Sequence, residues 1–539
     1  NQQRYYTQNA SYIFQFDVNQ PQITIINRYC YLNVSIPISY LYKTAILESM
    51  SYKKPLLVFT IFLIILSVMQ FTVPDIIGFD GYYHIKAADV IKNEGFIKEF
   101  PWAKYTILSD NYTDIQLLFR LLLIPFTFLD LNVGAKLASV LFAAIAFTTF
   151  YWFLSQNKIK YSFFWTLLYL FTSEFLMYRF MLPRQMPLAI ALLILTIYFM
   201  QKKKYWFLGI TSFAFVLLHS SFVFQILIII FYIISEKAFI KKFDYKLIIY
   251  PFIGLILALL INPYFPNNIS LLYTQIFKVN LISNLFNVEW KPWAFLEFIQ
   301  NNILVLFYIL ISSLMILKNK KITKTQTLFF SLTIFFLAYT SLSRRMQEFL
   351  VPFSILALAF LFNDYHKDMS IDNYKNNFLK IIKIVPILIL IIIAAFNFIL
   401  LRQDIKNNDF LFNFDGCTEW MKSNVPKNSL IFTNAYAFPY LFFKNSDLMY
   451  THGIDLTYSY LHDKNKFERY MAILQGKNKG KEDFIISDYN PDFVFSGKIK
   501  QDAQLFNYIK DHKENYKAVY EDEWCAVLEI KKDGTSVIS

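Results

Sequence analysis

The amino-acid sequence predicts a polytopic α-helical membrane protein with about eleven spans, followed by a soluble C-terminal α/β domain. Three observations lead to this fold class. Hydrophobic residues make up 56% of the 539 residues and charged residues only 17%, whereas soluble domains carry about 25% charge. Apolar runs of the length that a bilayer requires, about 20 residues, recur from Pro55 to Leu401. After Arg402 these runs stop and charged residues return.

The first 49 residues differ from the rest in composition. They are rich in Asn, Gln and Tyr and show no clean period. Met50, followed by Lys53, Lys54 and an apolar run, has the pattern of a natural start with a signal-anchor helix. The sequence therefore predicts that residues 1–49 are an upstream extension or a disordered tail.

The apolar runs define a membrane domain over residues 50–401. Lysine-rich loops between the runs fall on the same side as Lys53 and Lys54, which the positive-inside rule places in the cytoplasm. Residues 205–235 are interpreted as two short helices that turn at His219, because a single helix would put lysines on both sides. The predicted spans are residues 55–71, 134–154, 161–178, 185–200, 205–218, 222–235, 246–262, 295–317, 326–341, 347–363 and 378–401.

The same alternation places nearly all residues that could do chemistry on the outer face. The outer parts are the first loop 71–133, the Pro183-Arg184 turn, residues 262–294, the Ser343-Arg344-Arg345 turn and residues 402–539. We therefore expect a multi-pass protein of the plasma (inner) membrane with an extracytoplasmic C-terminal domain. The net charge of +13 is explained by the topology lysines, so it does not indicate a nucleic-acid partner.

Two acidic groups lie in the first outer loop. Asp80 comes shortly after the first span, and His84, one helical turn further on, is expected to face it. Asp110 and Asp114 form the second group, ahead of an interfacial helix over residues 117–129. Two separated carboxylate groups suit either a divalent cation or an acid and a base. An acidic residue just beyond a span can also be merely interfacial.

The motif Asp80-Gly81-Tyr82-Tyr83-His84-Ile85-Lys86 resembles the first-loop motif of oligosaccharyltransferase catalytic subunits. Those enzymes belong to the C-type (GT-C) superfamily of membrane glycosyltransferases, which have a first-loop acid, many spans and often an extracytoplasmic C-terminal domain. The resemblance implies a GT-C-like glycosyltransferase that moves a sugar from a polyprenyl-phosphate-linked donor to an acceptor on the outer face. It implies three catalytic residues, Asp80, His84 and Asp114, with Asp80 either the general base or a metal ligand.

The resemblance also implies binding residues for the donor and for a divalent cation. Arginine forks suit phosphate oxygens, but an arginine at a helix end can also snorkel, and an acidic residue beside tryptophans can belong to an interfacial belt. The implied donor-binding residues are Lys86, Arg184, His219, Arg344 and Arg345. The implied ligands of Mn²⁺ or Mg²⁺ are Asp80, Asp110, Asp114 and Glu289.

The residues after Arg402 predict a compact α/β domain. Short alternating runs at 429–433 and 493–496 are mixed with a helical pattern at 502–512. The opening of this domain resembles that of oligosaccharyltransferases, but residues 433–440 stand where that family has the Trp-Trp-Asp-Tyr-Gly motif that reads the acceptor sequon. The absence of this motif disfavours asparagine-linked protein glycosylation and leaves a protein, lipid or polysaccharide acceptor open. Residues 450–460 are expected to be structural rather than an acceptor contact.

Two alternative functions stay open. A surface-polysaccharide ligase or polymerase of another fold shares the large outer loop and the arginines. A lipid or oligosaccharide transporter would carry charged or broken segments at mid-membrane depth.

The cysteines give one further expectation. Cys30, Cys417 and Cys525 have no paired spacing, which excludes a zinc ribbon or a disulfide scaffold. Cys417 and Cys525 both lie in the C-terminal domain and could pair, but both stand beside tryptophan, so two buried free thiols are the expected state.

Overall fold

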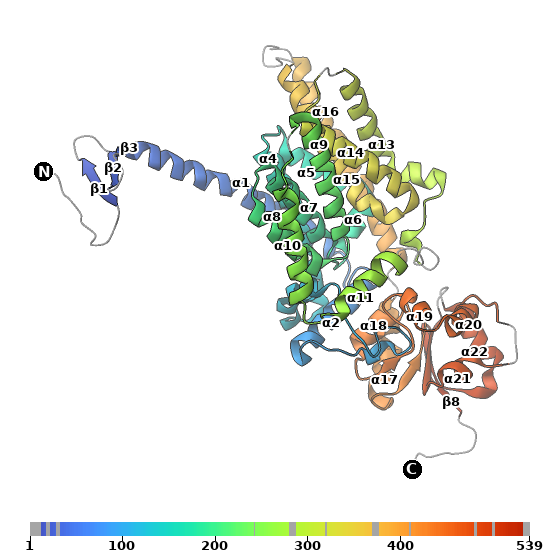
Figure 1. Ribbon diagram of the computed structural model, residues 1–539. Helices are drawn as coiled ribbons and strands as arrows, with labels where there is room; N and C mark the ends of the chain where they lie inside the picture. Colours follow the sequence, from blue (N-terminus) through green and yellow to red (C-terminus); the bar gives the residue numbers. More distant parts are fainter. Residues whose placement is uncertain are drawn as a thin grey trace. The chain divides into compact units, whose positions relative to one another are not determined.

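The structure is a computed structural model that describes residues 12–17, 22–27, 33–241, 243–279, 287–318, 321–368, 377–408, 411–478, 482–498 and 502–531. The chain forms two compact units, residues 1–62 and residues 63–539. In the first unit, three strands form an antiparallel sheet, and helix α1 (Ile38–Gln70) follows them (Figure 1). The strands are β1 (Tyr12–Asp17), β2 (Gln22–Asn27) and β3 (Asn33–Pro37). The origin of residues 1–49 as an upstream extension stays a prediction.

Helices lie at all the predicted spans. Seven helical segments of the described chain are long and apolar enough to cross a membrane. Two further helices, bent by 104° relative to each other, would make an eighth span if they cross the membrane together. This pair is α6 (Glu174–Met181) and α7 (Met186–Gln201). The chain is thus an integral membrane protein, while the number eleven stays a prediction. The seven segments are Lys53–Gln70, Leu131–Gln156, Phe222–Ile240, Phe295–Lys318, Lys324–Leu342, Arg344–Tyr365 and Val385–Lys406.

These segments belong to helices whose bounds are as follows: α4 (Leu131–Gln156), α9 (Phe222–Ile240), α13 (Phe295–Lys318), α14 (Lys324–Leu342), α15 (Gln347–Asp368) and α16 (Asn377–Asn408). Shorter apolar helices stand at three other predicted spans: α5 (Ser162–Phe171), α8 (Tyr205–Leu218) and α10 (Lys246–Ile261). Short segments between the helices are α11 (Asn267–Tyr273), η3 (Thr274–Val279), η4 (Val288–Trp290) and η5 (Arg344–Met346).

The predicted single span 161–178 is two helices. The Ser173 backbone is extended and its side chain accepts a hydrogen bond from the Leu176 backbone N–H at 3.1 Å, so it caps a new helix, α6. The chain then turns at Pro183-Arg184, and Pro187 stands in the first turn of α7. A capping serine therefore divides the predicted span into two helices, α5 and α6.

The first outer loop contains α2 (Asp80–Glu94), η1 (Pro101–Ala103), α3 (Leu117–Leu123) and η2 (Ile124–Phe128). Helix α2 begins at Asp80 itself and ends at Gly95, where φ is +78°. Segments α3 and η2 cover the predicted helix 117–129, which tightens at Pro125. Asp80 is thus the first residue of a helix rather than part of a flexible loop.

The C-terminal α/β domain is built on a five-stranded mixed sheet of order β5-β4-β6-β8-β7. Strand β4 runs parallel to β5 and β6, while β8 is antiparallel to β6 and β7. Buried side chains such as Phe432, Tyr470 and Leu505 form its core. The strands are β4 (Leu430–Phe432), β5 (Met449–Tyr450), β6 (Phe493–Gly497), β7 (Tyr516–Glu521) and β8 (Cys525–Ile530). The helices are η7 (Leu411–Phe414), α17 (Asp415–Asn424), α18 (Phe438–Lys444), α19 (Leu456–His462), α20 (Lys464–Leu474), α21 (Phe484–Tyr489), α22 (Ala503–Asp511) and η8 (Lys513–Asn515).

Cys417 and Cys525 form a disulfide, so the expectation of two free thiols is wrong. Helix α17 packs against β8 and brings together two cysteines that are 108 residues apart, with their Cα atoms at 6.3 Å. Such a separation lies within the range that a disulfide spans. Sequence spacing could not reveal the pair, because the two cysteines meet only when the helix folds onto the sheet.

The C-terminal domain packs directly on the first outer loop. The ring of Tyr82 in α2 meets those of Tyr440 and Phe443 in α18, with centroids 5.0 and 5.2 Å apart. The backbone N–H groups of Lys104 and Tyr105 donate to carbonyls at the end of β5, at 2.9 and 3.0 Å. Both kinds of contact hold the start of α2 against the domain.

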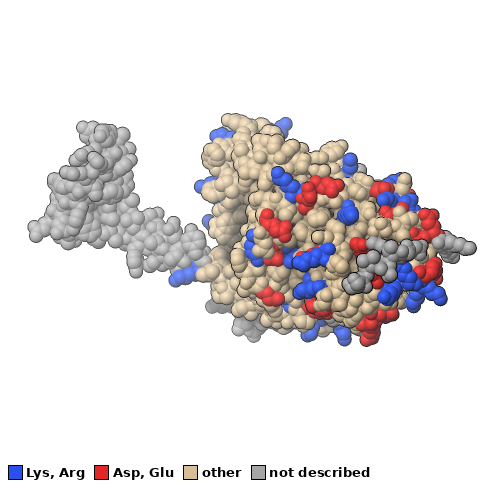
Figure 2. Space-filling view, turned by 90° about the horizontal axis from the view of Figure 1, so that it is seen from below, with Lys and Arg blue, Asp and Glu red and all other residues tan. Residues whose placement is uncertain are grey.

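Acidic and basic side chains gather together on the face seen in Figure 2, while much of the remaining surface in that view is uncharged. Charged side chains are costly in the bilayer core. This face is therefore expected to lie in water.

Candidate functional site

Asp80 lies against the turn between α6 and α7. Gly81 allows this approach, because a Cβ at that position would lie 2.5 Å from Ile76 Cγ2 and 2.8 Å from Pro183 Cγ. As a result, Arg184 Nη2 comes to 2.5 Å from Asp80 Oδ2. The role of Gly81 is close packing of α2 against the turn, not the flexibility that a glycine in a loop suggests.

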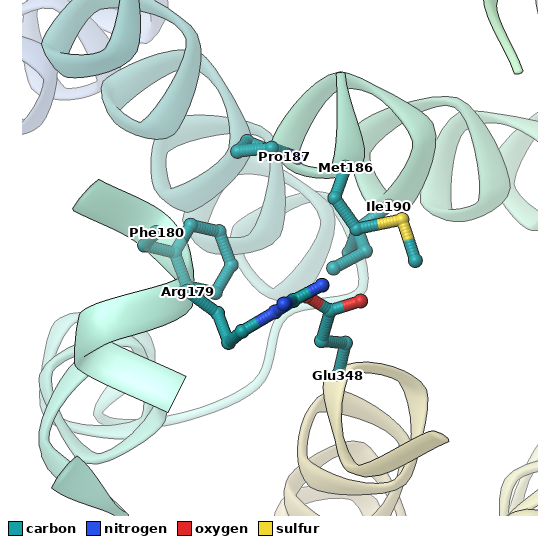
Figure 3. Close-up of a pocket in the computed structure, with 6 residues that line it drawn as sticks. All are labelled: Arg179, Phe180, Met186, Pro187, Ile190 and Glu348. Atoms are coloured by element: carbon teal, nitrogen blue, oxygen red, sulfur yellow. The ribbon is translucent and has the colours of Figure 1, made fainter. Parts of the chain in front are cut away.

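Further ion pairs extend from Arg184 into the protein. Arg184 Nη1 lies 3.3 Å from Glu289 Oε1, and Arg179 Nη1 lies 2.6 Å from the same oxygen. Arg179 Nε also donates to Glu348 at 2.5 Å, in a pocket whose other walls are apolar side chains of α6 and α7 (Figure 3). The Arg179 and Glu348 side chains are 2% and 3% exposed, whereas Asp80 is 44% exposed. We call the following five residues the arginine–carboxylate cluster: Asp80, Arg184, Glu289, Arg179 and Glu348. The cluster runs from its buried end at Arg179 and Glu348 to its open end at Asp80.

The cluster keeps unused hydrogen-bond donors. Arg179 Nη2 and Arg184 Nε are buried and have no acceptor among the described residues. Arg345 makes no ion pair with any of the described residues. Its guanidinium lies over the Trp290 ring, 5.2 Å from the ring centroid. Burial acts to raise the pKa of Glu289, but Arg179, Arg184 and Arg345 lower it overall, so this carboxylate stays ionised. Buried N–H groups without acceptors are unfavourable, so the site suits an added anion.

His219 lies at the turn between α8 and α9, beside these arginines. Burial lowers its pKa to about 3, and Arg345, Arg184 and Arg179 contribute in the same direction. The imidazole is therefore neutral at ordinary pH. Its Nδ1 accepts from the Ser221 backbone N–H at 3.1 Å, so Nε2 carries the proton. His219 is thus a neutral donor in a cationic environment.

Asp114 belongs to a separate buried network. Arg120 Nε donates to Asp114 at 3.0 Å, and both side chains are 3% exposed. Arg120 Nη1 also contacts His84 Nδ1, and burial and the Arg120 charge lower the pKa of His84 well below its usual range. The spacing predicts that His84 faces Asp80, but the partner of its Nδ1 is Arg120, and the ring packs against Phe119 of α3 with centroids 5.4 Å apart. The network braces the first outer loop behind the site.

The remaining predicted residues have other partners. Lys86 pairs with Asp89 at 3.2 Å, Arg344 pairs with Glu297 at 3.1 Å, and Asp110 is exposed and accepts from Ser109 at 3.2 Å. The structure brings together Asp80, Arg184 and Glu289, with His219 and Arg345 beside them. The predicted residues that lie away from these five are His84, Lys86, Asp110, Asp114 and Arg344.

Sequence reasoning missed three residues of this region. Arg179 and Glu348 were not predicted, although an arginine at the end of an apolar run was a usable signal. Asp455, at the N-cap of α19, accepts from the Thr457 backbone N–H at 2.8 Å. Burial raises the pKa of Asp455, and the charge of Asp80 contributes to this rise. The loop 450–460, predicted to be structural, thus also brings a carboxylate toward Asp80.

The segment that replaces the sequon-reading motif lies beside the start of α2. The Tyr436 ring lies 6.2 Å from that of Phe79, the residue before Asp80. The Tyr436 hydroxyl donates to Asp502 at 2.6 Å, and the Asn434 amide donates to the same carboxyl group at 3.0 Å. Residues 433–440 are therefore held in place by Asp502.

The four predicted metal ligands do not fit a divalent cation as folded. Asp80 and Glu289 are joined through Arg184, and Asp114 is paired with Arg120. Within the described ranges, the one group of three His, Cys, Asp or Glu side chains with ligand atoms within 4.8 Å is Cys417, Asp522 and Cys525. Its two sulfur atoms are bonded to each other.

The chain shares its fold with solved structures of an archaeal oligosaccharyltransferase and of ArnT. No protein-family model and no curated protein sequence matches the chain. The Archaeoglobus fulgidus oligosaccharyltransferase in its apo form is similar with a TM-score of 0.59, at 12% identity over 85% of this chain and 73% of that chain.

Two complexes share the fold. AglB, the oligosaccharyltransferase of Archaeoglobus fulgidus with an inhibitory peptide and a dolichol-phosphate, has a TM-score of 0.54 and 12% identity, over 81% of this chain and 69% of that chain. ArnT from Cupriavidus metallidurans, bound to undecaprenyl phosphate, also has a TM-score of 0.54, at 10% identity over 87% of this chain and 97% of that chain. At these identities the likeness concerns the fold.

Proposed function

We propose that this chain is a glycosyltransferase that moves a sugar from a polyprenyl-phosphate-linked donor to an acceptor on the outer face of the membrane. One observation carries the proposal: an exposed Asp80 lies beside arginines with unused N–H donors. The fold supports it, because solved structures with the same fold hold dolichol-phosphate and undecaprenyl phosphate. The shared fold also disfavours a polysaccharide ligase of another fold.

The arginines bind the phosphate of the donor. Negative charge grows on this phosphate as the bond to the sugar breaks, and positioned donors stabilise such charge. The unused N–H groups of Arg179 and Arg184, the unpaired Arg345 and the Nε2–H of His219 supply these donors. Charge-assisted hydrogen bonds to phosphate are about twice as strong as neutral ones.

Asp80 takes the proton of the acceptor. Arg184 holds its Oδ2, while Oδ1 has no partner in the described part of the chain and the side chain is 44% exposed. The bond from the anomeric carbon to the phosphate oxygen breaks and its electron pair stays on the phosphate. The acceptor atom bonds to the anomeric carbon and its proton passes to Asp80, a step worth about 10²–10⁴-fold in rate.

The C-terminal domain supplies the acceptor side of the site. Residues 433–440 and Asp455 both approach the start of α2. A disulfide between Cys417 and Cys525 supports an extracytoplasmic domain, because disulfides persist in oxidising compartments. The acceptor would therefore be met outside the cytoplasm.

The orientation can be tested with introduced cysteines and an impermeant thiol reagent in intact cells. Asn267 and Lys427 are exposed, and cysteines there should react. Lys203, 61% exposed in a predicted cytoplasmic loop, should not react until the cells are opened. Labelling of Lys203→Cys in sealed cells would place the site on the wrong side for this proposal.

The activity can be tested with the full chain in lipid nanodiscs. Binding of undecaprenyl phosphate is compared with binding of undecaprenol, which lacks the phosphate, and release of polyprenyl phosphate is followed from labelled donors. We expect phosphate-dependent binding and donor consumption. Equal binding of undecaprenol, with no consumption of any polyprenyl-linked donor, would refute the proposed function.

A further inference from the structure

The Arg184 guanidinium lies between two of the carboxylates that the family resemblance assigns to a divalent cation. Its Nη2 is 2.5 Å from Asp80 Oδ2, and its Nη1 is 3.3 and 3.4 Å from the two Glu289 oxygens. A guanidinium presents five N–H groups in a fixed plane, so a single one can join two carboxylates. A side-chain cation thus already bridges this acid pair.

Two guanidinium groups already pair with the three carboxylates of the cluster. Arg179 pairs with both Glu289 and Glu348, at 2.6 and 2.5 Å. A carboxylate that binds a divalent cation offers its negative charge to the ion. Here the carboxylate oxygens of Glu289 face two guanidinium groups, and an added dication would stand beside Arg184.

The other two predicted ligands, Asp110 and Asp114, do not complete a metal site with Asp80 and Glu289. Asp114 is buried in its pair with Arg120, and Asp110 is exposed on a different part of the loop, where Ser109 donates to it. In the part of the chain that the structure describes, neither residue joins Asp80 or Glu289 in a group of three possible ligands. Four carboxylates are present in the sequence, but they are not gathered at one point.

We infer that Arg184 takes the place of a divalent cation at this site, so the site binds neither Mg²⁺ nor Mn²⁺. Arg184 holds Asp80 and Glu289 together and keeps its Nε–H free for an anion. The part of the inference that concerns the donor phosphate rests on the proposed function. The part that concerns metal binding stands on geometry alone and can be measured without turnover.

The first test is metal binding by the full chain in nanodiscs, followed by the electron paramagnetic resonance of free Mn²⁺. Wild type and Asp80→Asn should take up Mn²⁺ equally, and a chelator should leave the thermal midpoint of the wild type unchanged. A single Mn²⁺ site in the wild type that is lost in Asp80→Asn would overturn the inference. Uptake of Mn²⁺ is measured without turnover of any donor. Failure of the inference can therefore be distinguished from failure of the proposed function.

The second test uses Arg184→Lys, which keeps one positive charge but cannot bridge two carboxylates in one plane. Undecaprenyl phosphate should bind the wild type equally with chelator and with Mn²⁺, and Arg184→Lys should bind it at least about tenfold more weakly. The matched control is Arg469→Lys, because Arg469 forks onto Asp488 at 2.6 Å in the C-terminal domain, and its binding should equal that of the wild type. Two results would refute a cation role for Arg184. One is that the wild type loses its binding of undecaprenyl phosphate in chelator; the other is that Arg184→Lys binds undecaprenyl phosphate as tightly as the wild type does.

Discussion

Replacement of Asp80 by asparagine separates catalysis from stability. Asn keeps the shape of the side chain but removes the charge and the capacity to accept a proton. The Asp80–Arg184 pair lies at the open end of the cluster, where the Asp80 side chain is 44% exposed. Solvent screens such a pair, which is therefore worth about 0.2–1 kcal/mol. Arg184 also keeps Glu289 as a partner, so the expected loss of stability is small.

The expected loss of activity is much larger. Removal of a general base lowers turnover by about 10²–10⁴-fold, which corresponds to about 3–5 kcal/mol of transition-state stabilisation. The two effects differ several-fold, so they are separable in one preparation. Donor turnover and the thermal midpoint of the wild type and of Asp80→Asn are measured in the same nanodiscs.

Asp75→Asn is the internal control for this experiment. Asp75 lies five residues earlier on the same loop and accepts a hydrogen bond from the Asn132 amide at 3.3 Å. Burial and the nearby Asp415 raise the pKa of Asp75, so loss of its charge should be tolerated and turnover should stay near that of the wild type. The assignment of Asp80 is refuted if Asp80→Asn keeps near-normal turnover while Asp75→Asn abolishes it.

Three further predictions follow from the packing. Gly81→Ala should displace Pro183 and destabilise the protein by about 1–3 kcal/mol. It should also slow turnover by about 10²-fold, because misplacement of a reacting group by about 1 Å has that effect. Unchanged turnover would show that the approach of α2 to this turn is not needed. Cys417→Ser removes a cross-link over 108 residues, so the free energy of unfolding of the C-terminal domain should fall by about 2–5 kcal/mol. Limited proteolysis should then cut the variant faster than the wild type. Resistance equal to that of the wild type would contradict this prediction. Burial raises the pKa of Asp502 to about 6, so the folded chain holds this proton more tightly than the unfolded chain, and stability should fall as the pH rises from about 4 to about 6. Hydrogen exchange of β6 should report this fall in the wild type but not in Asp502→Asn, and equal pH dependence of the two proteins would rule out Asp502 as its source.

Much of the fold could be predicted because it depends on local properties of the chain. Apolar run length marked the helices from α4 to α16, and the return of charge after Arg402 marked the C-terminal domain. Asp80 could be singled out because its motif is contiguous in the sequence. The break at Ser173 was missed, because a capping hydrogen bond from one serine interrupted a run that stays apolar on both sides.

The partners of the site residues could not be predicted in the same way. Arg184 was expected at the site, but its pairing with Glu289 joins residues 105 positions apart, and Asp80 lies far from both in the sequence. His84 has the helical spacing that would face Asp80, yet its ring contacts Arg120 and Phe119 of α3. Periodicity predicts the face of a helix, but not what that face meets.

The sequence by itself determined the membrane helices, the α/β character of the C-terminal domain and the position of Asp80 after the first span, because hydrophobicity and short motifs are read along the chain. Only the tertiary structure decided the Cys417–Cys525 bond, the pairing of Arg179 with Glu348 across 169 residues and the guanidinium between Asp80 and Glu289. These depend on how closely distant segments approach, and small residues such as Gly81 set that distance. Charge pairing acts over a few ångströms, so its outcome is decided only after the helices have packed.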